Sequence, residues 1–215
     1  MNNRRFIFAI ATAVVAGGLL LASLRLPLWH MRMEAPQYQG SEALKVVVLP
    51  GALRGDMNEI KTLNKYIGVT VPDTLPQTRW LPGALCGLAV LGLVVTFLPL
   101  RSRRFAAFGL AVLLAGTMLL AAGQAQLQMY RIGHDRNRHA ALVGVPDFTP
   151  PLLGNHKLAQ FELESRLGYG SFAIAGAVAL YAAMGFVSRD RKAAVFRVKN
   201  DLLVTRIPQI ADYSI

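Results

Sequence analysis

The sequence predicts an all-α membrane protein in which four transmembrane helices carry a small α+β cap built from two outer loops. Two observations support this class. The 215-residue chain is 53% hydrophobic and only 16% charged, and its mean hydropathy is +0.39. Its apolar residues are also gathered in four charge-free runs, each about the 20 residues that an α-helix needs to cross a bilayer. These runs cover residues 6–24, 81–100, 105–123 and 168–187.

Three arginines orient the predicted helices. Arg101, Arg103 and Arg104 fall in the short link between the second and third runs, and short loops rich in Lys and Arg stay on the cytoplasmic side. This predicts a multi-pass protein of the bacterial inner (cytoplasmic) membrane, with both termini in the cytoplasm and the whole chain as one integral membrane domain. The other segments follow from it: residues 26–79 and 124–167 are periplasmic, and the tail 188–215 is cytoplasmic.

The formal net charge of +11 raises the question of a nucleic-acid partner. Most of this excess lies in the predicted cytoplasmic segments, where the positive-inside rule places Lys and Arg. Topology therefore explains the charge, and no nucleic-acid partner is expected. The expected partners are the lipid bilayer and a membrane or periplasmic protein.

The first run has two interpretations that the sequence leaves open. Arg4 and Arg5 followed by an apolar run are typical of both a cleaved signal peptide and a retained anchor. The run is long for a signal peptide, and the cleavage site at residues 22–24 is only fair, which favours the anchor. Either interpretation leaves the topology of the other three helices unchanged.

The first outer segment contains signals of regular structure. Residues 44–49 (LKVVVL) read as a short strand bounded by a Pro-Gly pair. Asp56 and Glu59 have the spacing of a capping box, which predicts the start of an amphipathic helix. We expect this helix to lie on the membrane or on the other outer loop. Its apolar face comprises Ile60, Leu63 and Ile67.

The second outer segment begins as a helix and then loses regular structure. The third apolar run should continue as a helix to about Tyr130. Residues 146–151 contain three prolines, and proline removes a backbone donor and disrupts helices. A constrained loop is therefore expected there.

Several function classes are disfavoured. The four predicted spans contain no Asp, Glu, Lys, Arg or His, which ion-coupled transporters usually carry inside the membrane. The single cysteine, Cys86, excludes an intrachain disulfide and a CxxC redox site. The hydrolase patterns GxSxG and HExxH are also missing. The chain is therefore not expected to be an enzyme.

Histidine and methionine provide the strongest chemical signal in the outer segments. Imidazole and thioether ligands together suit copper, especially Cu(I), which is the only cofactor indicated. His30, Met31 and Met33 follow the first span, and His134 follows the third, so the two groups could meet in space. The alternative is that these are interfacial histidines and packing methionines. Further candidates in the same segments are Met57, Met129, His139 and His156.

Two groups of outer residues also carry a family resemblance. They comprise residues 30–38 (HMRMEAPQY), 55–60 (GDMNEI) and 63–68 (LNKYIG), then 130–134 (YRIGH) and 150–154 (PPLLG). Together they resemble an uncharacterised family of four-span bacterial membrane proteins. Members are often encoded beside the maturation genes of nitrous oxide reductase, a periplasmic copper enzyme. His134 matches the family pattern, whereas Lys65 and Val69 stand where members often carry His and Met.

The composition, the outer residues and the resemblance lead to one hypothesis and two alternatives. The first is an accessory protein that assists copper delivery to, or assembly of, a periplasmic copper enzyme such as nitrous oxide reductase. The second is a structural or scaffolding subunit of a membrane complex, whose cap docks a partner and binds no metal. A third is an enzyme acting on lipid or quinone at the outer interface, for which the sequence offers only the proline-rich loop and Tyr130.

Overall fold

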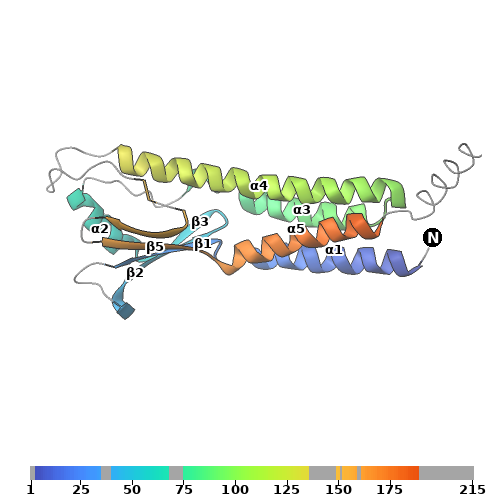
Figure 1. Cartoon of the computed structure of the whole chain (residues 1–215), viewed down its shortest axis with the longest axis horizontal. Coiled ribbons are helices and arrows are strands. Elements are labelled where there is room, and N and C mark those ends of the chain that lie inside the picture. Colours follow the sequence, from blue (N-terminus) through green and yellow to red (C-terminus); the bar gives the residue numbers. More distant parts are fainter. Residues whose placement is uncertain are drawn as a thin grey trace, which may run out of the picture.

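The computed structural model describes residues 3–34, 40–67, 75–135, 149–150, 152–158 and 161–188. Within them, four long helices form one end of an elongated molecule and a small sheet forms the other (Figure 1). All four helices are long and apolar enough to cross a membrane. They are α1 (Asn3–Ser23), α3 (Leu81–Val95), α4 (Leu100–His134) and α5 (Tyr169–Val187). The second of these spans reaches the required length only together with the short 3-10 helix η2 (Pro76–Thr78) before α3, as Pro76–Val95. The mostly helical fold and the presence of four long apolar helices are confirmed.

The four helices form a bundle in which α1 and α4 each pack against both α3 and α5. Small side chains allow the close contacts that hold helices together in a lipid environment. Ala9, Ala13 and Gly17, a stripe on α1, are all buried. Large apolar side chains instead cover the outside of the bundle, as Val14, Val112 and Phe172 do. The apolar outer surface is compatible with a lipid bilayer.

Tyr181 crosses the centre of the bundle from α5 to α3. Its side chain is fully buried, and its hydroxyl donates a hydrogen bond of 3.3 Å to the carbonyl oxygen of Leu88. Gly92 makes room for the ring, because a Cβ at that position would lie 2.1 Å from the tyrosine oxygen. A buried phenol needs such a partner, so this contact fixes the relative position of α3 and α5.

The turn between the second and third spans lies earlier in the chain than the sequence predicts. Helix α3 ends at Val95 and α4 begins at Leu100, so the turn consists of residues 96–99 and the arginines belong to the first turn of α4. The physical reason is Pro99, which occupies the N-cap position of α4. Proline lacks the N–H that a continuing helix would require, although it is apolar enough to resemble part of a span.

Arg103 closes this turn instead of pointing into solvent. Its side chain is 1% exposed, and its Nε and Nη2 donate hydrogen bonds of 3.2 and 2.9 Å to the carbonyl oxygen of Leu98. The guanidinium also lies over the ring of Phe6, 5.8 Å from its centroid. Arg103 thus ties the end of α3 to both α4 and α1.

Helix α4 extends well beyond the length of a simple span. Its 35 residues give a length of about 52 Å at 1.5 Å per residue, whereas the hydrocarbon core is about 30 Å thick. The predicted continuation past the third apolar run is confirmed, and it reaches His134 instead of ending near Tyr130. The last turns of α4 stand beside the sheet (Figure 1).

The remaining elements form what we call the cap, which comprises a five-stranded antiparallel sheet and helix α2 (Met57–Ile67). The strand order is β3-β2-β1-β5-β4, so the two outer segments of the chain contribute to one sheet. The predicted strand at residues 44–49 and the predicted helix after Asp56 are confirmed. The strands are β1 (Trp29–Glu34), β2 (Leu44–Leu49), β3 (Ala52–Gly55), β4 (Gly154–Leu158) and β5 (Phe161–Leu167).

Two of the chain's passages between the bundle and the cap lie side by side: residues 24–28, which link α1 to β1, and Gly168, which links β5 to α5. We call these two crossings together the junction. Strand β1 follows α1, β5 leads into α5, and β1 pairs with β5 just as α1 packs against α5. The N–H groups of Gly168 and Gly170 donate hydrogen bonds of 2.9 and 2.8 Å to the carbonyls of Leu28 and Pro27. The hydroxyl of Ser171 also donates to Leu28, at 2.7 Å. The N–H groups at the start of α5, which have no partner within the helix, are therefore satisfied by the carbonyls of the segment that links α1 to β1.

Candidate functional site

The two faces of the cap sheet differ because successive residues of a strand point in opposite directions. We call one of them the packed face. Here Met33, Leu44, Val46 and Leu163 form a buried apolar cluster with Ile60 of α2. Further side chains pack against this cluster: Met31, Leu53 and Met57.

The structure separates the predicted metal ligands of the first outer segment. Met31 and Met33 alternate with His30 along β1, so the imidazole lies on the opposite face of the sheet from the two thioethers. Met33 is only 9% exposed and packs in the apolar cluster. The predicted group of His30, Met31 and Met33 is therefore not one compact set of ligands.

His134 is the last residue of α4 and is exposed. Its Nδ1 lies 2.9 Å from the carbonyl oxygen of Tyr130, and the two rings stack with centroids 3.9 Å apart. Both contacts are made within the same helix. His139 lies outside the described residues, as do all but two positions of the proline-rich run 146–151.

The structure brings together three methionines that lie apart in the sequence. Met57, the first residue of α2, joins Met31 and Met33 at the packed face. His156 points to this same face, because it pairs with Leu163, which in turn pairs with Met33. Within the described ranges, no three His, Cys, Asp or Glu side chains are grouped so that they could hold a metal. Any soft-metal site there would rest on methionine sulfur.

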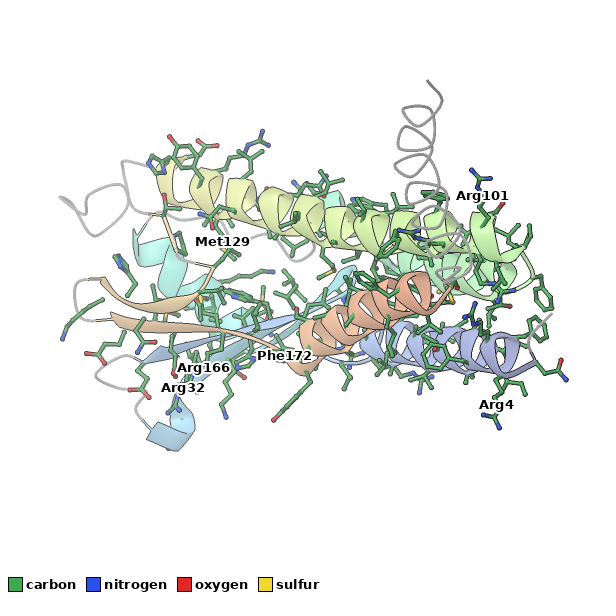
Figure 2. All side chains as sticks on the ribbon, turned by 45° about the vertical axis from the view of Figure 1, so that its right-hand side comes forward. Arg4, Arg32, Arg101, Met129, Arg166 and Phe172 are labelled. Atoms are coloured by element: carbon green, nitrogen blue, oxygen red, sulfur yellow. The ribbon has the colours of Figure 1, made fainter. Side chains whose placement is uncertain are left out.

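The opposite side of the sheet, which we call the charged face, carries side chains of both signs. Arg32 and Glu34 form an ion pair of 2.7 Å, Lys157 and Glu162 form one of 3.1 Å, and Arg166 pairs with Glu164. Figure 2 shows Arg32 and Arg166 on the same side of the sheet. By strand register, the polar and charged residues of this face are His30, Arg32, Glu34, Lys45, Arg54, Asn155, Lys157, Glu162, Glu164 and Arg166, beside the apolar Val47, Leu49 and Ala52.

These charged side chains are poorly placed to stabilise the fold. The ion-paired groups are between 29% and 69% exposed, and exposed ion pairs contribute about 0–1 kcal/mol each. A hollow of about 390 Å³ lies among the side chains at the end of the sheet far from the helices. Exposed charges of both signs around a hollow can form complementary ion pairs with a polar surface.

Neither the family models nor the curated proteins compared with this chain give a significant match.

Proposed function

We propose that this chain is an accessory protein of the bacterial inner membrane whose periplasmic cap docks a protein partner. The charged face carries this proposal, since it presents exposed charges on a sheet that the junction holds in a fixed position on the bundle. The family resemblance suggests which partner to test. On that basis the protein assists the assembly of, or copper delivery to, a periplasmic copper enzyme such as nitrous oxide reductase.

The distribution of arginines supports a periplasmic location for the cap. Arg4, in the first turn of α1, and Arg101, in the first turn of α4, lie at the end of the bundle opposite the cap (Figure 2). Arg5 and Arg104 belong to the same two helical turns. The positive-inside rule places this end in the cytoplasm.

Reversal of one charge tests the docking surface. We expect Arg166→Glu to weaken binding of the purified full-length protein to purified apo nitrous oxide reductase, because Arg166 is 69% exposed on the charged face. Binding of the unchanged protein should also fall as salt rises, since exposed charges are screened within about 10 Å at 0.1 M ionic strength. Surface plasmon resonance with the protein held in nanodiscs would measure both effects.

The matched control is Arg131→Glu, which makes the same change at an exposed position on α4, away from the charged face. Equal weakening by the two variants would show that net charge, and not this face, governs binding. Absence of binding by the unchanged protein would overturn nitrous oxide reductase as the partner.

Copper handling by the cap is a second candidate function, favoured by the gathering of Met31, Met33 and Met57 at the packed face. If it is correct, the purified protein should bind Cu(I) stoichiometrically. Replacing Met31 and Met57 by leucine should weaken that binding while preserving the fold, because Met-to-Leu exchanges nearly conserve volume. Competition with a chromophoric Cu(I) chelator would measure the affinity.

Met118→Leu on α4 is the matched control, since this residue lies against the bundle core, away from the cap cluster. His30→Ala and His134→Ala should be titrated in parallel. Weaker Cu(I) binding in His134→Ala alone would instead identify His134 as a ligand, as the sequence favours, in place of the methionines of the packed face. A protein without stoichiometric Cu(I) binding would leave docking as the function.

A further inference from the structure

An apolar cavity of about 190 Å³ lies where the cap meets the helix bundle. Trp29 lines it from the cap, Leu81 from the start of α3, and Met118, Ala125 and Met129 from α4. Met129 points from α4 towards the sheet (Figure 2). The cavity therefore lies between the C-terminal half of α4 and the strands β1 and β5 at the junction.

The polar side chains in the cavity wall already have hydrogen-bond partners. Trp29 Nε1 donates to the carbonyl of Leu152, Thr78 donates to that of Leu75 at 3.1 Å, and Ser171 donates to that of Leu28. The described lining thus leaves no side-chain donor free. A buried water needs about 2–4 polar partners, and apolar cavities of about 150 Å³ stay dry and accept hydrocarbon ligands.

The depth of the cavity places it at the outer boundary of the hydrocarbon. Met118 and Met129 follow Arg104 by about 21 and 38 Å along α4, at 1.5 Å per residue. If the arginines mark one boundary of a hydrocarbon core about 30 Å thick, the cavity straddles the other. Trp80 and Tyr169 are exposed at the helix ends near the cavity, as expected of an aromatic belt.

We propose that this cavity binds a segment of one acyl chain of a bilayer phospholipid. An acyl chain is apolar throughout and matches a wall without free polar side chains. A quinone ring is a poorer match, because its carbonyl oxygens would be desolvated without hydrogen-bond donors. The cavity is partly open to the outside, and two of its lining residues, Leu153 and Leu167, are 56% and 43% exposed. This opening gives a chain a route of entry.

Tryptophan fluorescence can test this assignment directly. The chain contains two tryptophans, so Trp80→Phe leaves Trp29 in the cavity wall as the only one. We would reconstitute this variant in phosphatidylcholine vesicles whose acyl chains are either unmodified or brominated, since bromine quenches tryptophan at short range. Trp29 emission should be lower in the brominated vesicles. The loss of emission should disappear when the cavity is filled by Ala125→Leu or, independently, by Ala122→Leu.

The matched control is Ala175→Leu, an exposed position on α5 that does not line the cavity. In this variant the emission of Trp29 should be quenched by brominated lipid as strongly as in Trp80→Phe alone. Circular dichroism should show the same helix content for all variants. The proposal would be overturned if the cavity-filling variants were quenched as strongly as Trp80→Phe alone, or if Trp80→Phe alone were not quenched. In unbrominated vesicles containing ubiquinone, quenching that depends on the empty cavity would overturn the assignment to an acyl chain.

Discussion

Gly168→Ala should severely destabilise the protein. A Cβ at Gly168 would lie 2.1 Å from the carbonyl oxygen of Pro27 and 2.7 Å from its carbonyl carbon. Both atoms are backbone, so neither can move aside by changing rotamer. Relief requires separating the two crossings of the junction, which would break the hydrogen bonds from Gly168 and Gly170 to Leu28 and Pro27. Overpacking and two lost hydrogen bonds together cost about 3 kcal/mol or more.

Thermal unfolding in detergent, followed by circular dichroism, would measure this loss. Gly123→Ala is the control, because a Cβ at this position of α4 meets nothing within 4 Å. Since alanine favours a helix by about 0.5–1 kcal/mol over glycine, that variant should be unchanged or slightly more stable. Similar unfolding temperatures for the two variants would show that the junction tolerates a wider separation.

The orientation of the bundle should give an all-or-none labelling result. The sole cysteine, Cys86, can be replaced by alanine to give a cysteine-free background. Asn155→Cys then places a thiol at an exposed position of the cap, and Phe97→Cys places one in the turn before α4, where Phe97 is 75% exposed. If the arginine end faces the cytoplasm, as we propose, an impermeant maleimide should label only the cap thiol in intact spheroplasts.

Lysis of the spheroplasts should make the turn thiol reactive, which controls for its accessibility. The reverse pattern, with the turn labelled before lysis and the cap only after it, would place the cap in the cytoplasm. The docking and copper proposals would then lose their periplasmic partner, whereas the acyl-chain cavity would be unaffected.

The apolar runs predicted the helices well because bilayer length and lack of charge are properties of the local sequence. Helices α1 and α5 begin and end within three residues of the predicted bounds. The boundary between α3 and α4 was wrong because hydropathy does not register the missing N–H of Pro99. Hydropathy likewise could not reveal that the Arg103 side chain turns inward and donates a hydrogen bond to the carbonyl of Leu98.

The candidate site was harder to predict because its geometry depends on strands that pair across the chain. Trp29–Glu34 alternates apolar residues with His, Arg and Glu, and Phe161–Leu167 does the same with charged residues except at Ser165. Such alternation is the local signature of a half-buried strand, which was not predicted for either segment. Recognition of β1 would have placed His30 opposite Met31 and Met33. The pairing of β1 with β5 joins segments more than 120 residues apart, and no local pattern specifies it.

The cap is attached directly to two helices of the bundle, because β5 passes into α5 through one residue and β1 follows α1 after residues 24–28. Only Gly168 separates β5 from α5, and its N–H is bonded to the neighbouring crossing. We therefore expect a change in tilt between α1 and α5 to shift β1 along β5, because hydrogen bonds tie the two crossings together. Conversely, a protein bound to the sheet would oppose that change in tilt. Binding at the cap and the packing angle of α1 against α5 would then be coupled.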